Sequence, residues 1–425
     1  MSEKKNVPKL RFPEFTEPWE QRKLKNILVS LQNNTLSRAD LSNETGVAKD
    51  VHYGDVLIKF GEVLDISKEK LPMITDEKVL TKYKTSFLQN GDVVVADTAE
   101  DTTVGKCSEI AELNDEVVIS GLHTIPYRPV EKFATGYLGY YLNSDSYHNQ
   151  LIPLMQGIKV TSISKSAMQD TNIIYPNSKE EQAKIGKYFI TLDNLITLHQ
   201  RKLDHVKDLK KSMLQKMFPK NGQLYPEVRF PEFTDAWEQR KLGEISDKVT
   251  KKNQDVVVDE AFTNSAEYGI ISQRDFFDKD IANTENIDGY YVVEPNDFVY
   301  NPRISTTAPF GPIKRNKLER SGAMSPLYYV FRPNNVDLSY LEWFFQTSCW
   351  YPFMRFNGNS GARSDRFAIT DKIFNEMPIS LPQDIEEQKR IGMFLTTLDT
   401  LITLHQRELD HLKLLKKGML QQMFV

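Results

Sequence analysis

The sequence predicts an α+β fold in which two pseudo-symmetric, mixed α/β heads are joined by two long antiparallel coiled-coil helices. Residues 10–24, LRFPEFTEPWEQRKL, return at 228–242 as VRFPEFTDAWEQRKL. Residues 180–218 return at 386–424 with 27 identical residues in 39 aligned. The segments between these repeats show no comparable identity. Internal repeats of this strength indicate a duplicated scaffold, and the dissimilar segments indicate two different heads.

The repeats divide the 425 residues into four expected parts. These are a first head with its N-terminal anchor over 1–179, a helix over 180–218, a second head over 219–385, and a C-terminal helix over 386–425. Each head is long enough to enclose its own core.

Composition limits the class of protein. Two cysteines, Cys107 and Cys349, argue against a disulfide scaffold and for a reducing cytosol, and neither has metal-type spacing. There is no run of about 18 apolar residues, so we expect a cytoplasmic protein without membrane segments. The net charge is −4, and the parts of the heads without the anchors, residues 25–179 and 243–385, each contain 15 Lys and Arg against 20 Asp and Glu. A nucleic-acid-binding face would therefore have to be a local basic cluster.

The shorter repeat predicts an extended, proline-bounded anchor at the entry of each head. We expect its aromatic side chains to pack into the core rather than to bind a ligand. They are Phe12, Phe15 and Trp19 in the first copy and Phe230, Phe233 and Trp237 in the second.

The longer repeat predicts a helix of about 55 to 60 Å in each copy. Apolar residues alternate in steps of four and three, which is the spacing of a coiled-coil seam. Ser178 with Glu181 and Asp384 with Glu387 predict a capping box at each start. The seam residues expected to form the scaffold and bind partners are Leu192, Ile196, Leu203, Val206, Met213, Leu398, Ile402, Leu409, Leu412 and Met419.

Apolar residues beside the seam widen it, so each helix could contact a second neighbour from another protein. They are Leu195, Leu198, Leu209, Leu401, Leu404 and Leu415.

His199 and His405 occupy seam positions, with His205 and His411 six residues further along. Six residues rotate a helix by about 600°, so one helix cannot present both of its histidines to one metal ion. We interpret them as polar residues that fix the helix register, and we predict no metal site.

Short β-like runs with turn residues between them predict mixed heads. Strands are expected at 55–60, 92–96, 116–120, 268–272, 290–293, 297–300 and 327–331, and helices around 135–150 and 338–350.

Polar loops in the heads are candidates for contact with phosphates or base edges. Two of them contain glycine, MQGIKVTSIS at 155–164 and NGNSGARSDRF at 357–367, and the others follow expected strands. Arg pairs with guanine, and Gln or Asn with adenine. A plain surface turn remains the alternative for these loops. The DNA-binding candidates are Thr98, Thr102, Lys106, Gln156, Lys159, Thr161, Gln273, Arg274, Asn301, Arg303, Thr306, Asn359, Arg363 and Arg366.

Catalytic motifs are missing, so no catalytic residue is predicted. TVGK at 103–106 lacks the first glycine of a phosphate-binding loop, and NPRI at 301–304 lacks the aromatic residue of an amino-methyltransferase loop. The sequence contains neither HExxH nor GxSxG. A recognition subunit fits better than an enzyme.

The whole chain resembles the specificity subunit of type I restriction-modification enzymes. The similarity is carried by the strand before each EEQ helix start (176–185 and 382–391), by the LD-LI-LH-R segments (192–201 and 398–407) and by the WEQRKL entries. The resemblance implies two variable target-recognition domains, each of which reads one half of a bipartite, asymmetric site in double-stranded DNA. It also implies that the coiled coil sets the spacer between the two halves.

The resemblance further implies that two methyltransferase subunits dock on the scaffold and methylate adenine. Two motor-nuclease subunits then join for ATP-dependent restriction. By the same resemblance this chain binds no cofactor, and S-adenosylmethionine, ATP and Mg²⁺ serve the partner subunits. The alternative, which suits the acidic charge, is a non-catalytic adaptor that bridges two proteins without reading DNA.

Overall fold

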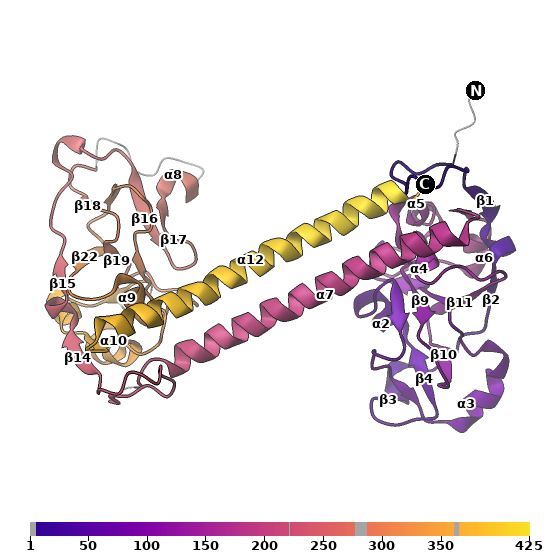
Figure 1. Ribbon diagram of the computed structural model, residues 1–425, viewed down its shortest axis with the longest axis horizontal. Helices are drawn as coiled ribbons and strands as arrows, with labels where there is room; N and C mark the ends of the chain where they lie inside the picture. Colours follow the sequence, from indigo (N-terminus) through magenta and orange to yellow (C-terminus); the bar gives the residue numbers. More distant parts are fainter. Residues whose placement is uncertain (1–5, 221, 277–286, 361–364) are drawn as a thin grey trace. The chain divides into compact units, whose positions relative to one another are not determined.

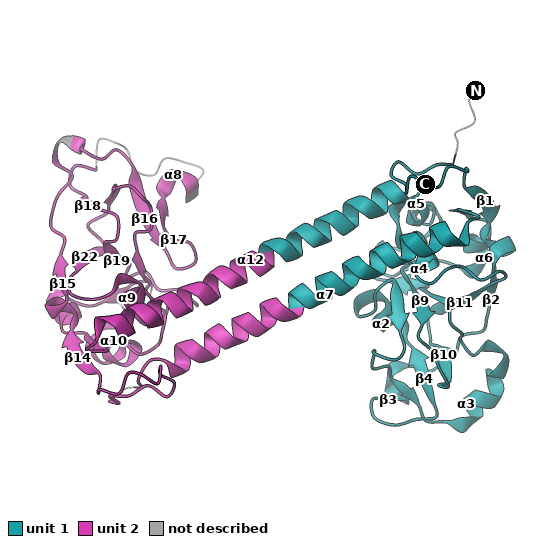
Figure 2. Cartoon of the chain, in the orientation of Figure 1, with its two compact units in different colours: residues 1–200, 407–425 teal, residues 201–406 magenta. Residues whose placement is uncertain are grey.

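The computed structural model describes residues 6–220, 222–276, 287–360 and 365–425. The chain divides into two compact units (Figure 2). Unit 1 contains Met1–Gln200 and Arg407–Val425, and unit 2 contains Arg201–Gln406. In the part of the chain that is described, no helix is both long and apolar enough to cross a membrane.

Two long helices dominate the helical content, α7 (Lys179–Lys216) with 38 residues and α12 (Ile385–Met423) with 39. Unit 1 contains the start of α7 and the end of α12, which lie side by side there, and unit 2 contains the opposite ends (Figure 1). The two helices are therefore antiparallel, and the predicted pair of long coiled-coil helices is confirmed.

The first head contains two sheets, with strand orders β2-β11-β7-β9-β5 and β10-β4-β6-β3, and two smaller pairs, β1-β13 and β8-β12. Its strands are β1 (Glu20–Lys23), β2 (Leu28–Ser30), β3 (Leu41–Ser42), β4 (Ala48–Val51), β5 (Val63–Asp65), β6 (Met73–Ile74), β7 (Val93–Ala96), β8 (Thr98–Ala99), β9 (Cys107–Ala111), β10 (Val118–Ser120), β11 (Thr124–Pro129), β12 (Thr161–Ser162) and β13 (Asn172–Tyr175). Its short helices are α1 (Leu24–Ile27), α2 (Tyr53–Ile58), α3 (Glu77–Lys82), α4 (Tyr137–Asn143), α5 (Asp145–His148) and α6 (Lys165–Gln169).

The second head has sheets with the orders β15-β22-β19-β20 and β17-β16-β21-β18, and the pairs β14-β25 and β23-β24. Its strands are β14 (Glu238–Lys241), β15 (Ser246–Lys248), β16 (Ala261–Ser265), β17 (Gly269–Ser272), β18 (Tyr291–Val293), β19 (Phe298–Tyr300), β20 (Ile313–Arg315), β21 (Gly322–Met324), β22 (Tyr329–Pro333), β23 (Asn359–Ser360), β24 (Phe367–Ala368) and β25 (Pro378–Leu381). Its short helices are α8 (Gln273–Phe276), α9 (Leu338–Phe344), α10 (Tyr351–Asn357) and α11 (Asp371–Asn375).

The two heads share one framework despite their dissimilar sequences. In the first, β11 is antiparallel to both β2 and β7, and β4 is parallel to β10. In the second, β22 is antiparallel to both β15 and β19, and β16 is parallel to β21. The two heads are therefore pseudo-symmetric, as the sequence predicted.

Three local predictions need correction. Residues 55–60, expected as a strand, lie largely in α2, because His52 caps that helix and Val56 and Phe60 are buried one turn apart. The expected helix at 135–150 is two helices, α4 and α5, which meet at Ser144. The helix expected at 338–350 is α9 alone, which ends at Phe344.

Each anchor is attached to a long helix by a buried glutamate. The Glu181 carboxylate accepts hydrogen bonds from Arg11 Nε at 2.7 Å and Trp19 Nε1 at 3.2 Å. In unit 2, Glu387 accepts the equivalent bonds from Arg229 and Trp237, also at 2.7 and 3.2 Å.

This arrangement corrects the predicted capping boxes. Ser178 Oγ does accept from Glu181 N, and Asp384 Oδ1 accepts from Glu386 N. The glutamate side chains do not return to the cap, because they bind the anchor arginine and tryptophan instead.

Aromatic packing closes each unit and confirms that the anchor tryptophans belong to the core. Trp19 packs edge-on against Phe424, just beyond the end of α12, and Trp237 packs edge-on against Phe218, just beyond the end of α7. Backbone bonds of 2.9 Å repeat the pattern, from Leu10 N to Gln422 O and from Val228 N to Lys216 O. Each anchor thus joins the start of one long helix to the end of the other.

Candidate nucleic-acid interface

A buried carboxylate positions the central strand of each head. Asp92 precedes β7 and is bound by Arg128 through Nε at 2.9 Å and Nη2 at 2.7 Å. Asp297 precedes β19 and is bound by Arg332 through Nε at 2.7 Å and Nη2 at 3.0 Å. Both aspartates also accept the backbone N–H three residues earlier at 2.8 Å. The strands therefore start from equivalent turns, and candidate loops begin where they end.

In the first head two candidate loops come together as one ribbon, which we call the first ribbon (residues 97–99 and 155–163). Thr161 pairs with Ala99 and Ser162 with Thr98, and Ile163 N donates to Asp97 O at 2.9 Å. Four predicted residues lie on it: Thr98, Gln156, Lys159 and Thr161.

The outer turn of the first ribbon depends on Gly157. Its φ is +110°, and a Cβ there would lie 2.0 Å from Val160 O, so only glycine fits. Gln156, Ile158 and Lys159 are exposed along this turn. The ribbon thus presents a polar amide, an apolar side chain and an ammonium group to solvent.

The other two candidates of the first head lie off the ribbon. Thr102 is exposed, and its carbonyl oxygen lies 2.8 Å from His148 Nε2. Lys106 is half-buried and donates to Leu57 O at 2.8 Å, and burial lowers the pKa of its ammonium group. The DNA contact of Lys106 remains a prediction, and the ammonium group already has an internal partner.

The second head has a matching second ribbon (residues 302–304, 359–360 and 365–368). Arg303 and Arg366 form an antiparallel bridge, Ile304 N donates to Asp365 O at 3.0 Å, and β23 pairs with β24. The predicted residues Arg303, Asn359 and Arg366 therefore lie together, all of them exposed. Thr306 is exposed on the same loop, and Arg363 lies outside the described residues.

The remaining candidates do not join the second ribbon. Asn301 is buried, where its amide donates to Asn264 O at 2.8 Å and its Oδ1 accepts from Arg303 N at 3.0 Å. Asn301 therefore supports the start of the ribbon loop. Gln273 and Arg274 lie on α8, where Gln273 donates to Phe262 O at 3.2 Å.

A cavity lies beside each ribbon at the same place in the two frameworks. The first, of about 480 Å³, is bounded by residues 31–33, the start of β11 and residues 163–165. The second, of about 530 Å³, is bounded by Lys248, the start of β22 and residues 369–371. Sequence analysis missed the part of the first cavity formed by Gln32 and Asn33. The polar run that follows β2 is the signal that could have revealed it.

The coiled coil shows where the predicted scaffold residues lie. Leu192 and Leu203 on α7, and Leu398 and Leu409 on α12, are buried, and the other seam residues are half-buried: Ile196, Val206, Met213, Ile402, Leu412 and Met419. The seam is thus largely occupied by contacts within this chain.

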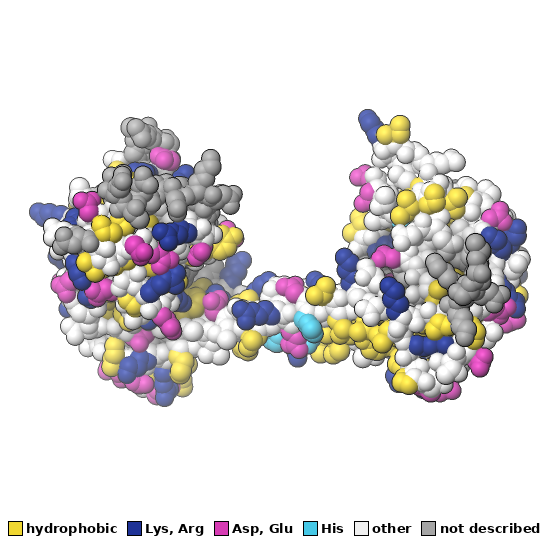
Figure 3. All heavy atoms as spheres, turned by 90° about the horizontal axis from the view of Figure 1, so that it is seen from above, with side chains coloured by type: hydrophobic (Ala, Val, Ile, Leu, Met, Phe, Trp, Pro, Cys, Tyr) yellow, Lys and Arg dark blue, Asp and Glu magenta, His cyan; other side chains and the backbone are white. Residues whose placement is uncertain are grey.

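Apolar residues beside the seam remain exposed. Leu195, Leu198, Leu401 and Leu404 are between 37 and 52% exposed. In unit 1 an apolar groove of about 520 Å³ runs between the two helices and is lined by Phe12, Tyr188, Leu195, Leu412 and Leu415. Figure 3 shows apolar side chains gathered along the helices beside the first head.

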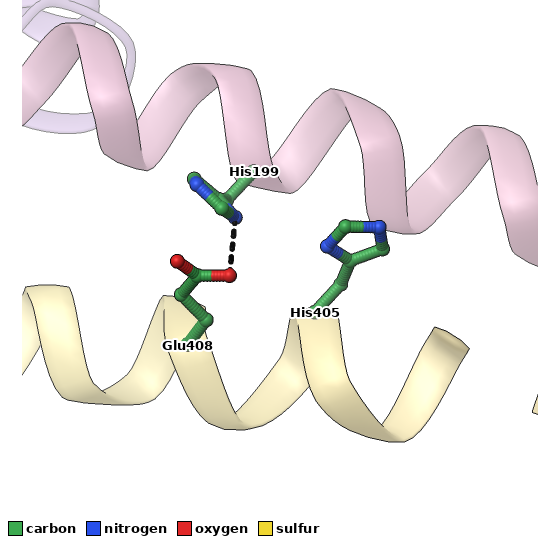
Figure 4. Close-up of side chains that lie close together, drawn as sticks. All are labelled: His199, His405 and Glu408. Atoms are coloured by element: carbon green, nitrogen blue, oxygen red, sulfur yellow. Dashed lines mark ion pairs between the residues drawn. The ribbon is translucent and has the colours of Figure 1, made fainter. Parts of the chain in front are cut away.

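A polar seam position in unit 1 has a partner. His199 on α7 and Glu408 on α12 point toward one another, with 3.3 Å between Nδ1 and Oε2 (Figure 4). This contact fits the expectation that the seam histidines contribute to register.

Comparison with known proteins identifies the family. Residues 16–208 and 234–414, one stretch in each half, match the family model described as the type I restriction modification DNA specificity domain. The chain belongs to this family. Specificity subunits of type I systems recognise DNA sequence, and they are generally non-catalytic subunits that work with methyltransferase and restriction subunits.

Individual relatives agree in length with this specificity chain. A protein of Methanocaldococcus jannaschii, assigned as the MjaX type I restriction enzyme specificity subunit, is 24% identical over 97% of this chain and 94% of its own. The crystal structure of a type I restriction-modification S subunit from M. genitalium matches with a TM-score of 0.57 at 13% identity, covering 99% of both chains. This second likeness shows that the fold is shared.

Proposed function

We propose that each head binds one half of a bipartite, asymmetric site in double-stranded DNA. The observation that carries the proposal is the pairing of one framework with two different ribbons. The Asp92–Arg128 and Asp297–Arg332 pairs hold equivalent strands, whereas the ribbon residues beyond those strands differ. A two-stranded ribbon is narrow enough to enter the major groove. Two like frameworks with unlike ribbons suit two unlike half-sites.

We further propose that the helical scaffold docks methyltransferase subunits that methylate adenine. The apolar groove of unit 1 supports this, because Leu195 is 38% exposed there next to Lys184 and Lys187. In unit 2, Leu401 occupies the equivalent helix position and is 37% exposed. Exposed leucines at equivalent positions of the two units fit two copies of one partner.

Chemistry in this proposal belongs to the partners. S-adenosylmethionine is used by the methyltransferase subunits, and ATP and Mg²⁺ by two motor-nuclease subunits that add restriction. This chain recognises the DNA sequence and provides the scaffold on which the methyltransferase and motor-nuclease subunits assemble.

The test is to co-express the chain with its methyltransferase partner and map N6-methyladenine across the DNA of the expressing cell. The expected result is methylation at a split motif with two defined halves and a fixed gap. A complex that assembles and leaves the DNA unmethylated, with no salt-dependent affinity for duplex, would favour the adaptor that bridges proteins without reading DNA.

A further inference from the structure

The cavity beside the first ribbon is held rigidly on the side formed by Gln32. Leu31 N donates to Pro126 O at 2.8 Å, Gln32 N donates to Ser86 Oγ at 3.1 Å, and Asn34 N donates to Ser120 O at 2.8 Å. The buried Asn34 side chain also donates to Asp50 at 2.6 Å. The backbone that carries Gln32 is therefore fixed to three separate elements of the head.

The Gln32 side chain itself is free to bind. It is exposed, and within the described residues its amide makes no hydrogen bond. A side-chain amide held on a fixed backbone loses less entropy on binding than one on a mobile loop. Gln32 thus has the form of a prepared hydrogen-bonding group at the edge of a polar cavity.

Two lysines lie at the same cavity and make its net charge positive, whereas the head as a whole is acidic. Lys82 and Lys165 line it, both are exposed, and neither forms an ion pair with a described residue. Lys82 Nζ lies 4.9 Å from the centre of the Tyr83 ring. Asp97 is the one carboxylate among the lining residues, and it accepts a hydrogen bond from Thr98. The cavity is therefore basic in a head with more acidic than basic residues.

We propose that this cavity is where the first head reads its half-site, with Gln32 contacting a base edge and Lys82 and Lys165 contacting the flanking phosphates. The occupant is double-stranded DNA. The Gln amide matches the donor and acceptor pair of adenine in the major groove, and lysine suits phosphate as a point charge. The inference rests on the proposed function and deepens it by naming the reading residues.

The corresponding cavity of the second head has a different lining, as two different half-sites would require. There Lys248 is paired with Asp371, so its charge is neutralised. Tyr291, Tyr328 and Tyr329 supply much of the wall. A neutral, aromatic cavity and a basic, amide-bearing one in equivalent places do not select the same bases.

The experiment uses the whole complex with its methyltransferase partner and compares Gln32→Ala, Lys82→Ala and Lys165→Ala with the unchanged chain. Lys132→Ala is the matched control, since Lys132 is exposed, has no ion pair among the described residues and lies beside Phe133 on the scaffold side of the head. Each complex is used to map N6-methyladenine. Its affinity for a duplex carrying the motif of the unchanged complex is then measured at several salt concentrations.

Gln32→Ala is expected to relax one position of one half-site, reducing discrimination there by about tenfold to a hundredfold, with the other half-site unchanged. Each lysine variant is expected to weaken binding to all sequences alike. It should also reduce the salt slope, which is the slope of log affinity against log salt concentration, by about one. Lys132→Ala should match the unchanged complex, and all variants should melt at the same temperature because these side chains are exposed.

Retention of the full motif by Gln32→Ala, or relaxation of both half-sites, would overturn the inference while leaving the proposed function in place. The inference would also be overturned if Lys82→Ala and Lys165→Ala showed the same salt slope as Lys132→Ala. If the unchanged complex itself shows no split motif, the proposed function fails first, and the two failures are thereby distinguished.

Discussion

Lys416 on α12 and Asp193 on α7 form a cross-helix ion pair in unit 1, with 2.7 Å between Nζ and Oδ1. Lys416 also contacts Glu62 at 2.9 Å, so it joins both helices to the first head. Burial lowers the pKa of Lys416, but the two carboxylates outweigh this and raise it overall. In unit 2, Lys210 pairs with Asp399, each 206 residues from its counterpart. Each of these largely buried lysines thus has a carboxylate partner on the other long helix.

The two lysines make a matched pair of variants. Lys416→Met should destabilise unit 1 by about 2 to 3 kcal/mol, because it leaves two partly buried carboxylates facing one another. Lys210→Met should destabilise unit 2 by less than about 1 kcal/mol, since Asp399 is more than half exposed. Hydrogen exchange of each unit measures both effects, and equal losses would contradict this explanation.

The arginine that binds the buried aspartate should be equally necessary in the two heads. Arg128→Met and Arg332→Met each leave a carboxylate that is at most 2% exposed without its partner. We expect each variant to destabilise its own head by about 3 kcal/mol and to leave the other head unchanged. Hydrogen exchange resolved by segment checks this, and loss in both heads from one variant would contradict independent frameworks.

The stability of unit 1 should depend on pH through Asp50. Burial raises the pKa of Asp50 to about 7, an effect that Asp55 adds to and that Asn34 and Arg38 oppose. Since the folded-state pKa lies above the unfolded value, this contribution is present below about pH 4 and is lost as the pH rises through 7. The loss should be about 4 kcal/mol, since each unit of pKa shift corresponds to about 1.4 kcal/mol.

Asp50→Asn should therefore flatten the fall in melting temperature of unit 1 between about pH 4 and about pH 7. Burial also raises the pKa of Glu109 to about 7, so Glu109 should supply a further part of the slope, which Glu109→Gln should remove. A slope that is unchanged in Asp50→Asn would show that Asp50 does not titrate in this range.

The groove between the helices should be where methyltransferase subunits attach. Leu195→Asp places a charge in the groove of unit 1 and should remove one of two methyltransferase copies, and Leu401→Asp should remove the other. Leu414→Asp is the control, because Leu414 is exposed outside the groove and the equivalent position of α7 is naturally Asp208. The mass of the assembled complex reports the number of copies, and full assembly with Leu195→Asp would exclude the groove.

The long helices and the anchors could be predicted from sequence because their signal is local and repeated. A heptad pattern can be recognised within a single helical segment, and identity between two copies can be recognised from the sequence alone. The capping boxes were only half correct, because whether Glu181 turns to its own cap or to Arg11 depends on a residue 170 positions away.

The pseudo-symmetry of the two heads was predicted from the repeats around them, but the framework that they share could not be predicted from the head sequences. That framework rests on few positions, such as Asp92 with Arg128 and Asp297 with Arg332, scattered among residues that differ. The segment at 55–60 shows the same limit, since its apolar residues fit a strand until the cap at His52 and the burial of Val56 favour a helix. Candidate ribbon residues were chosen by type, and only strand pairing showed which of them meet.

The packing of Phe424 against Trp19 has a consequence for the order in which the protein forms during synthesis. Trp19 leaves the ribosome about 400 residues before Phe424, yet the two belong to one core. The core of the first head therefore stays incomplete, with part of its aromatic surface uncovered, until the whole second head has been translated. Phe218 follows α7 directly and meets Trp237 only 19 residues later, so unit 2 has no such delay at this contact. The head that is made first is thus the last to be completed.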